Sequence, residues 1–277
     1  GRLPLTRKPT DLGEVIEAGE GTTVQPGQRM IVRKQLSDPT PYTRSWGSQV
    51  SHSLTDESSL VLVPENVSDE RAIYAKVSGI SLHGVKRANV QAGEWVVVVG
   101  LGIIGHLVVQ HAVARGAKVI AVDMADDRLQ LAKRAGALHT LSAADAKAVD
   151  TAHEISGGGA DVAFDATGLA SVLEPTSLYL KARAWDDDPA NCGRLVLQGT
   201  VEDPVTLDYM ALFRREIDLI TPRDCDTQDL VDSLDLMAAD KLHPEIIPAT
   251  TYSFRECAEA YPKLVSREIM RVLYTWE

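Results

Sequence analysis

The chain has 277 residues, of which 44% are hydrophobic and 24% are charged, and its formal net charge is −11 at pH 7. This length allows one large domain or two ordinary ones, and the composition is ordinary for a soluble globular protein. The acidic balance argues against nonspecific binding to nucleic acid or to an anionic membrane, and it favours a cytoplasmic protein.

The three cysteines are far apart and form no CxxC pair, which argues against a disulfide framework and against a cysteine-rich zinc site. No early segment combines basic residues with a long apolar run, so we expect neither a signal peptide nor a membrane span. The longest apolar runs are only a few residues long and are typical of sheet strands.

The first predicted elements are short strands. The stretch GEVIEAGEGTTVQPGQRMIV, residues 13–32, alternates and turns as antiparallel strands do, and SSLVLVP predicts another strand that ends at Pro64. Ser68 is then a predicted helix N-cap, followed by two acidic residues in a first turn where the helix dipole favours them. We expect this helix to run toward His83.

Beyond that helix, the pattern alternates between apolar strands and helices. A fully apolar run predicts a strand that is buried on both faces, and the helix-spaced stretch IIGHLVVQHAVARG follows it. Strand after helix after strand predicts βαβ units, and hence an α/β protein with a doubly wound parallel Rossmann sheet. The predicted strands of this sheet are WVVVVG, KVIAVD, HTLSA, DVAFDATG, GRLVLQGT and EIDLITP, in chain order.

The tail of the chain returns to a mixed pattern. The stretch TQDLVDSLDLMAADKL predicts an amphipathic helix, and SFRECAEAYPKLV begins with a capping box formed by Ser253 and Glu256. MRVLYTW predicts a closing strand.

The stretch GLGIIG, between the first strand of the predicted sheet and its helix, points to a ligand. Gly100 permits a tight turn, Gly102 lets the backbone approach a pyrophosphate, and Gly105 lets the helix pack on the strand. With Ile103 and Ile104 between them, the glycines open a helix whose N-terminus attracts phosphate.

Asp123 ends the next predicted strand. A carboxylate there accepts hydrogen bonds from the adenosine ribose hydroxyls and repels a 2′-phosphate, so the pattern predicts NAD(H) in preference to NADP(H). Two alternatives stay open. The glycines could serve only to let the helix pack tightly, or the ligand could be another adenine cofactor such as FAD or S-adenosylmethionine.

A longer stretch resembles a known family. Residues 69–137, from DERAIYAKVSG through the glycine turn to LAKRAGA, are similar to the medium-chain dehydrogenase/reductase family, which includes the zinc alcohol dehydrogenases. The likeness extends upstream through residues 13–32 and downstream to IMRVLYT. It implies a GroES-like β-rich domain over residues 1–73, which is either reduced at its N-terminus or preceded by residues outside this sequence, a Rossmann domain over 74–224, and a segment 225–277 that returns to the first domain.

The resemblance also implies further cofactor contacts. In the family, the matching positions lie beside the adenosine ribose, the nicotinamide ribose, the carboxamide and the pyrophosphate. The matching residues here are Arg128, Ala166, Thr167, Gln198, Gly199, Thr200 and Arg271. The same resemblance implies a small-molecule substrate and a homodimer formed through the cofactor domain.

The positions that hold zinc in the family differ here. A family Gly-His-Glu motif stands ahead of a glycine that matches Gly13, and Lys8, Pro9 and Thr10 occupy its places. A further family cysteine ligand falls near Ala75. None of these residues is a usual zinc ligand, so the sequence predicts no metal and a zinc-independent reaction.

Few residues are candidates for moving a proton. Tyr42, His52, His83 and Asp11 lie in or near the half expected to form the substrate cleft, and His52 is a candidate general acid. Surface exposure or interior packing is the alternative interpretation for each. The acidic stretch AWDDDPANC, residues 184–192, predicts a surface loop that gates a cleft, contacts a partner or is a neutral insertion.

Together these patterns predict a zinc-independent, NAD(H)-dependent oxidoreductase. It transfers a hydride between nicotinamide and a carbonyl, an alcohol or an activated alkene of a small molecule. The alternative is a non-catalytic NAD(H)-binding protein of the same fold, such as a sensor, a scaffold or a degenerate subunit. The substrate, the direction of the reaction and the proton donor do not follow from the sequence.

Overall fold

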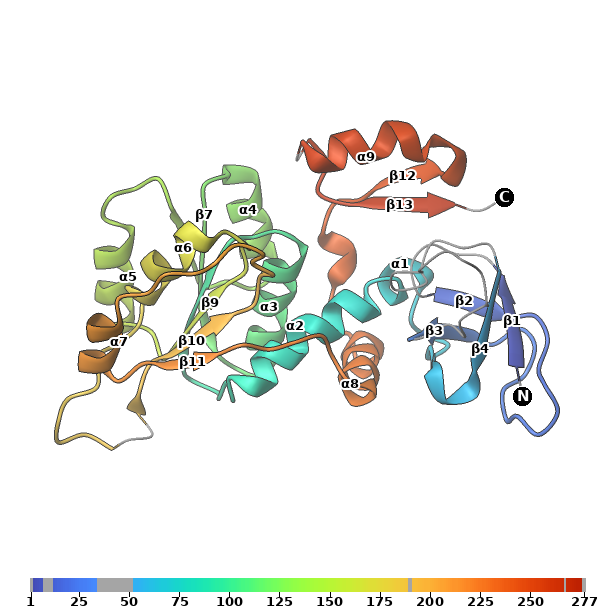
Figure 1. Ribbon diagram of the computed structural model, residues 1–277, viewed down its shortest axis with the longest axis horizontal. Coiled ribbons are helices and arrows are strands. Elements are labelled where there is room, and N and C mark those ends of the chain that lie inside the picture. The colour runs from blue at the N-terminus through green and yellow to red at the C-terminus, as the bar shows by residue number, and fades with distance from the viewer. Residues whose placement is uncertain (1, 7–11, 34–51, 189–190, 267, 276–277) are drawn as a thin grey trace. The chain divides into compact units, whose positions relative to one another are not determined.

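A computed structural model describes residues 2–6, 12–33, 52–188, 191–266 and 268–275, with the backbone alone for residues 2–6. The chain divides into two compact units, Gly1–Lys76 with Thr227–Glu277, and Val77–Asp226. Figure 1 labels the elements of each unit. Among the described residues, no helix is long and apolar enough to cross a bilayer.

The first unit contains a five-stranded antiparallel sheet in the order β4-β1-β2-β3-β5. Leu12 pairs with Ile31, so the predicted antiparallel strands of residues 13–32 are confirmed. Val15, Val24 and Met30 form a small core there. The strands are β1 (Arg2–Thr6), β2 (Leu12–Val15), β3 (Arg29–Val32), β4 (His52–Asp56) and β5 (Leu60–Leu62).

The rest of the first unit consists of helices and one strand pair. The predicted capping box of Ser253 and Glu256 is confirmed, because both of its hydrogen bonds are present. The closing strand β13 pairs in parallel with β12, a strand that the sequence did not predict. These elements are η1 (Glu57–Ser59), α1 (Asp69–Ala72), α8 (Thr227–Ala238), η3 (Pro244–Ile246), β12 (Thr250–Ser253), η4 (Phe254–Glu256), α9 (Cys257–Val265) and β13 (Val272–Thr275).

The helix predicted to run from Ser68 toward His83 is broken, so that prediction was wrong. Helix α1 ends at Ala72, and Ser68 makes no side-chain hydrogen bond as its N-cap. The amide of Tyr74 donates to the carbonyl of Arg71, three residues back, which tightens the turn. The buried Tyr74 hydroxyl donates to the carbonyl of Ile247 at 2.8 Å. This contact with a distant segment accompanies a break that local helix propensity does not indicate.

The second unit is built on a six-stranded sheet in which every pair is parallel, in the order β11-β10-β9-β6-β7-β8. This confirms the predicted α/β class and doubly wound parallel sheet. The order reverses between β6 and β9, and α/β sheets bind ligands outside the carboxyl ends of their strands at such a switch point. The strands are β6 (Trp95–Val99), β7 (Lys118–Asp123), β8 (His139–Ser142), β9 (Val162–Asp165), β10 (Arg194–Leu197) and β11 (Asp218–Ile220).

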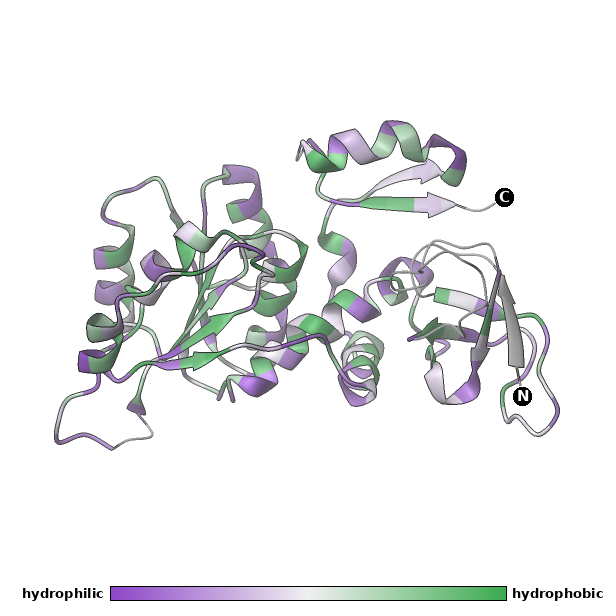
Figure 2. Ribbon diagram, viewed as in Figure 1, coloured by the Kyte–Doolittle hydropathy of each residue, from purple (hydrophilic) through white to green (hydrophobic). Residues whose placement is uncertain are grey.

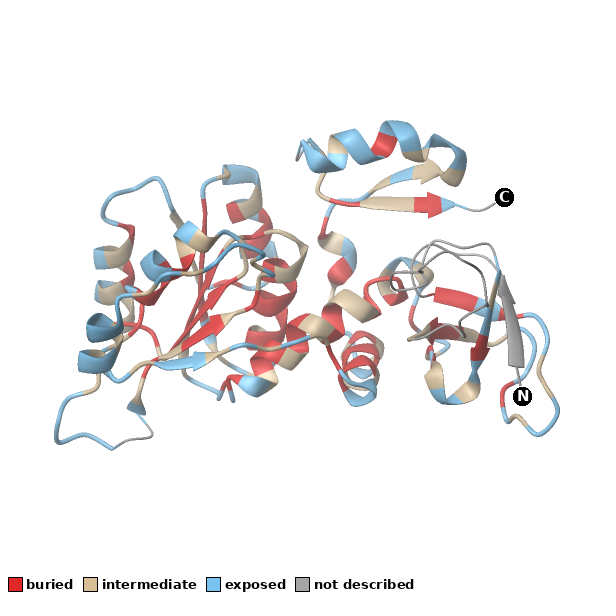
Figure 3. Ribbon diagram, in the orientation of Figure 1, coloured by how far each residue is buried: buried red, intermediate tan, exposed pale blue. Residues whose placement is uncertain are grey.

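Helices cover both faces of this sheet, which is why its central strands β6, β7 and β9 are largely apolar and buried (Figures 2 and 3). Residues of α2, α3 and α4 pack on one face around Val98 and Phe164. Residues of α5 and α6 pack on the other face around Ile120 and Leu195. The helices are α2 (Ala75–Arg87), α3 (Ile103–Ala114), α4 (Asp126–Arg134), α5 (Ala148–Ser156), α6 (Ala170–Ser177) and α7 (Tyr209–Arg215).

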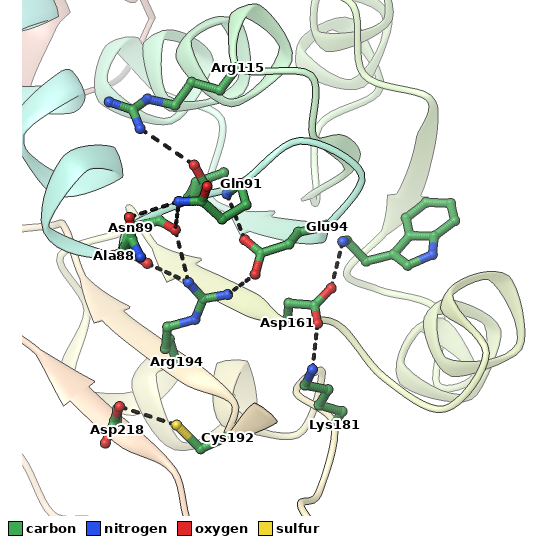
Figure 4. A network of polar contacts seen from close by, with 12 residues as sticks. Ala88, Asn89, Gln91, Glu94, Arg115, Asp161, Lys181, Cys192, Arg194 and Asp218 are labelled. Atoms are coloured by element: carbon green, nitrogen blue, oxygen red, sulfur yellow. Dashed lines mark hydrogen bonds and ion pairs between the residues drawn. The ribbon is translucent and has the colours of Figure 1, made fainter. Parts of the chain in front are cut away.

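Charged side chains pair with one another at the amino ends of these strands (Figure 4). Arg194, the first residue of β10, forms an ion pair with Glu94 and donates to the carbonyl of Ala88 at 2.6 Å. Asp161 accepts from Lys181 at 2.6 Å and from the amide of Trp95 at 2.8 Å. This network joins the segments that lead into β6, β9 and β10.

Candidate functional site

The glycine turn after β6 lies at the carboxyl edge of the parallel sheet. Gly100 has a φ of +87°, and a Cβ atom there would lie 2.6 Å from Cγ2 of Thr167. A Cβ atom on Gly105 would lie 1.9 Å from the carbonyl oxygen of Gly100. Both positions therefore need glycine, one for its backbone conformation and both for the close approach of neighbouring atoms.

Gly102 differs from these two glycines, because a Cβ atom there would meet no protein atom within 4 Å. It is the N-cap of α3, and no side chain caps the helix. The N–H groups of the first turn, which includes Ile103 and Ile104, have no partner inside the helix. The result is an open backbone cradle at a positive helix end, a geometry that suits a phosphate.

Asp123, the last residue of β7, connects this turn to the start of α4. Its Oδ2 accepts from the amide of Leu101 at 2.6 Å, and its Oδ1 accepts from the amide of Ala125 at 3.0 Å. The guanidinium of Arg128 lies 3.7 Å from Oδ2. A carboxylate has about four acceptor positions, so Asp123 retains acceptor capacity for ligand hydroxyls.

The ends of β9 and β10 meet beside the same turn. A Cβ atom on Gly199 would lie 2.3 Å from the amide nitrogen of Gly168 and 3.3 Å from the carbonyl carbon of Ala166. A Cβ atom on Gly168 would lie 2.8 Å from the carbonyl oxygen of Thr200. Ala166, Thr167, Gly199 and Thr200 are thus gathered at one edge with the glycine turn.

Gln198 directs its side chain into the protein. Its Nε2 donates to the carbonyl of Ile80 in α2 at 3.2 Å. The side chain is buried, and its Oε1 lies 1.7 Å from where a Cβ atom on Gly84 would stand. Only the backbone of Gln198 therefore faces the sheet edge, and its predicted contact with a cofactor stays a prediction.

Arg271 belongs to the other compact unit. Its guanidinium donates to the carbonyl of Ile73 at 3.1 Å and lies 3.5 Å from the centre of the Tyr74 ring. Burial raises the pKa of Tyr74, and the neighbouring guanidinium opposes that shift. The role predicted for Arg271 at a pyrophosphate stays a prediction.

Two of the predicted proton-transfer candidates lie among the described residues, one in each unit. His52 is exposed on β4 of the first unit, whereas His83 is half-buried on α2 of the second. Tyr42 and Asp11 lie outside the described residues, as do Lys8, Pro9 and Thr10. Ala75 is buried at the start of α2. No group of three His, Cys, Asp or Glu side chains suited to a metal occurs among the residues that the structure describes.

Two buried titratable residues near this edge were not among the predicted site residues. His106, directly after the glycine turn, is fully buried, neither ring nitrogen has a hydrogen-bond partner, and burial lowers its pKa to about 4. Asp165, the last residue of β9, is 2% exposed, and burial raises its pKa. An acidic residue at the end of an apolar strand, as at Asp123, was the signal that could have identified Asp165.

The loop predicted over residues 184–192 is exposed at residues 184–188 and 191, Cys192 is half-buried, and Trp185 is 90% exposed. Arg183 pairs with Glu216 and donates to the carbonyl of Asp187. Hydrogen bonds from Asn191 and from the amide of Asp188 lower the pKa of Asp187. Trp185 lines a hollow with residues of α7, among them Tyr209 and Phe213.

The fold and this edge define a Rossmann-type protein, and comparisons with known proteins agree. The profile of the zinc-binding dehydrogenase family matches residues 104–239. D-xylulose reductase of Morganella morganii is 26% identical over 269 residues, which are 90% of this chain and 74% of that protein. An uncharacterized zinc-type alcohol dehydrogenase-like protein of Escherichia coli K12 is 31% identical over 239 residues, 82% of this chain and 63% of that one.

Solved structures show the same fold. The 2R,3R-butanediol dehydrogenase of Bacillus subtilis has a TM-score of 0.82 at 20% identity, covering 100% of this chain and 93% of that one. An alcohol dehydrogenase of E. coli CFT073, solved with NADH, has a TM-score of 0.83 at 19% identity, covering 100% and 92%. The chain spans between 48% and 78% of the lengths of its curated relatives. These similarities support a member of the medium-chain dehydrogenase/reductase family.

Proposed function

We propose that this chain is an NAD(H)-dependent oxidoreductase. The observation that carries the proposal is the open cradle at Gly102 together with Asp123, whose carboxylate accepts a hydrogen bond from the amide of Leu101 in the same turn. Free N–H groups at a helix end suit a pyrophosphate, and a carboxylate at the end of the second strand suits ribose hydroxyls. When bound, the nicotinamide supplies the hydride chemistry, and the protein supplies orientation.

The proposed reaction is hydride transfer at the nicotinamide end of this edge. In the oxidative direction, the bound nicotinamide would accept the hydride released when a C–H bond of an alcohol breaks, and the hydroxyl proton would leave to water or to a side chain. Ala166, Thr167, Gly199 and Thr200 would border the nicotinamide, and their place at the sheet edge beside Gly100 supports this assignment. Arg128 supports Asp123 at the adenosine end.

The substrate class follows from the relatives. Among them are a D-xylulose reductase, a (R,R)-butanediol dehydrogenase and an erythritol/L-threitol dehydrogenase. Their names support a small polyol or secondary alcohol, with its ketone, as the substrate pair. The sequence analysis also allows an activated alkene as the group of the substrate that accepts the hydride.

The reaction is further proposed to need no zinc. The sequence supports this, because Lys8, Pro9 and Thr10 occupy the positions of the family's zinc-ligand motif. Ala75 lies near the sequence position at which the family has a further cysteine ligand. A zinc-free enzyme of this fold would work by holding the substrate carbon close to nicotinamide C4.

Binding and turnover test these proposals together. The protein is titrated with NADH and NADPH by calorimetry, and then offered polyols and ketones while NADH absorbance is followed, with and without a chelator. We expect NADH to bind more tightly than NADPH, and turnover to be unaffected by the chelator. Tighter binding of NADPH would contradict the interpretation of Asp123. Loss of turnover with chelator and its recovery with Zn²⁺ would overturn zinc independence, and tight NADH binding without any turnover would favour the non-catalytic alternative.

A homodimer formed through the second unit is also proposed. Strand β11 ends the sheet, and Leu219 on it is 48% exposed. Tyr209 and Phe213 on α7 are 69% and 57% exposed. Unpaired strand edges and clustered exposed aromatic residues are typical of subunit interfaces. Sedimentation of Phe213→Glu should then show monomer where the wild type shows dimer, and an unchanged sedimentation coefficient would contradict this interface.

A further inference from the structure

Asp165 shapes the turn that follows β9. Its Oδ1 accepts two hydrogen bonds from Thr167, one from the amide at 2.8 Å and one from the hydroxyl at 2.6 Å. The Thr167 hydroxyl oxygen in turn accepts from the amide of Leu169 at 3.1 Å. A single carboxylate oxygen therefore determines both the backbone and the side-chain direction of Thr167.

This turn is wedged between the two neighbouring strand ends. On one side, the amide of Ala166 donates to the carbonyl of Val99, and Cγ2 of Thr167 fills the space where a Cβ atom on Gly100 would stand. On the other side, the carbonyl of Asp165 accepts from the amides of Gln198 and Gly199 at 2.9 and 2.8 Å. A shift of Thr167 would therefore move against the glycine turn, because the space between them is already filled.

The carboxyl group of Asp165 is buried at the end of an otherwise apolar strand. Oδ2 of Asp165 is buried and has no hydrogen-bond partner, and neighbouring positions along β9 are fully buried apolar residues. Leaving a buried polar atom unpaired costs stability. A site that keeps such a group despite the cost is a candidate for a functional role.

We propose that Asp165 is a positioning residue for the nicotinamide half of the cofactor. It acts through Thr167, which it holds against the glycine turn. This inference rests on the proposed NAD(H) function. In this proposal the two carboxylates have separate roles at the sheet edge. Asp123 fixes the adenosine side of the glycine turn through Leu101, and Asp165 fixes the nicotinamide side through Thr167.

The test separates the two halves of the cofactor by comparing ADP, which carries only the adenosine half, with NADH. Both are titrated calorimetrically into the wild type, Asp165→Ala and Asp165→Asn, and unfolding is measured for each. In Asp165→Ala we expect the NADH dissociation constant to rise about tenfold while that of ADP stays within about twofold. Asp165→Asn keeps an acceptor oxygen for Thr167, so it should restore NADH affinity to within about threefold of the wild type.

A second variant keeps the test decisive if Asp165→Ala does not fold. Thr167→Val retains the shape of the side chain and loses the hydroxyl that donates to Asp165. Like Asp165→Ala, it should therefore raise the dissociation constant of NADH and leave that of ADP nearly unchanged. Unchanged NADH affinity in both variants, or equal weakening of ADP and NADH, would overturn the proposal. A wild type that binds neither nucleotide would instead reject the proposed function, and this inference with it.

Discussion

The two ends of the parallel sheet are built from the same strands and satisfy their polar groups differently. At the amino end, Arg194 pairs with Glu94 and Lys181 pairs with Asp161, so opposite charges neutralise one another (Figure 4). At the carboxyl end, Gly102 faces open space, and buried atoms of His106 and Asp165 have no hydrogen-bond partner. The amino end joins strands together, whereas the carboxyl end keeps unused hydrogen-bonding capacity.

This difference indicates that features of the carboxyl end lower the free energy of unfolding. Unpaired buried polar atoms and glycines at crowded positions each lower stability or raise the demand on packing. Gly100, Gly105 and the unpaired Oδ2 of Asp165 lie at the edge where parallel sheets bind ligands, and the amino end holds a crowded glycine, Gly159, and an unpaired Nε of Arg194. Substitutions at the amino end should therefore change stability and leave ligand binding alone, while some substitutions at the carboxyl end should do the reverse.

The largest effect is expected from Gly105→Ala at the carboxyl end. The new methyl group would lie 1.9 Å from the carbonyl oxygen of Gly100, a backbone atom that cannot move without opening the turn. We expect the free energy of unfolding, measured in urea, to fall by about 3 kcal/mol or more. The matched control is Gly102→Ala, whose methyl group meets open space and should cost about 1 kcal/mol at most. Equal losses in both variants would contradict the close packing at Gly105.

The next effect is a pH dependence that comes from His106. Burial lowers its folded-state pKa to about 4 from an unfolded value of 6.5, so the neutral imidazole favours folding. That stability is complete above pH 6.5 and is lost progressively as the pH falls from 6.5 to 4, by up to about 3 kcal/mol. His106→Leu should lose less stability than the wild type over this range in urea titrations. Parallel curves for the two proteins would contradict a neutral, buried His106.

At the amino end, Arg194→Met should lower the free energy of unfolding by about 2 kcal/mol, because it leaves Glu94 partly buried without its partner. NADH affinity, measured by calorimetry, should stay within about twofold of the wild type, since the network lies at the other end of the strands. The double variant with Glu94→Gln should recover part of the loss. A large change in NADH affinity would break the proposed separation between the two ends.

The smallest of these effects is a change of cofactor preference. Asp123→Ala should weaken NADH binding about tenfold and leave NADPH binding unchanged or improved, because the carboxylate that repels a 2′-phosphate is gone. Asp127, exposed in the first turn of α4, provides the matched control Asp127→Ala, which should leave the preference unchanged. If both variants weakened NADH and NADPH equally, Asp123 would have only a structural role through Leu101 and Ala125.

Much of the second unit could be predicted from the sequence, because its central strands are apolar on both faces and its turns contain recognisable residue patterns. The glycine turn and Asp123 follow this rule, since glycine spacing and an acid at a strand end are local patterns. The break between α1 and α2 could not be predicted, because Tyr74 is anchored to Ile247 from a distant part of the chain. The parallel partner of β13 was missed for the same reason, since β12 alone is a short polar segment.

The candidate site was predictable in part. Glycines and strand-end residues are identified by their position, whereas the role of a buried polar side chain depends on what surrounds it in three dimensions. His106 interrupts an apolar helix and Asp165 ends an apolar strand, yet only the structure shows that each holds unpaired atoms. The order of strands likewise brings β6, β9 and β10 together although other elements separate them along the chain.

The central claim is that the open cradle at Gly102 holds the pyrophosphate of NAD(H). Calorimetric titration of NADH into the wild type and into Gly102→Val, with urea unfolding of both, tests it most directly. We predict one site per chain in the wild type, a loss of affinity of about tenfold or more in Gly102→Val, and little change in unfolding, because the added side chain meets no protein atom near its Cβ. Equal NADH affinity in the two proteins, or no binding by the wild type, would contradict the account.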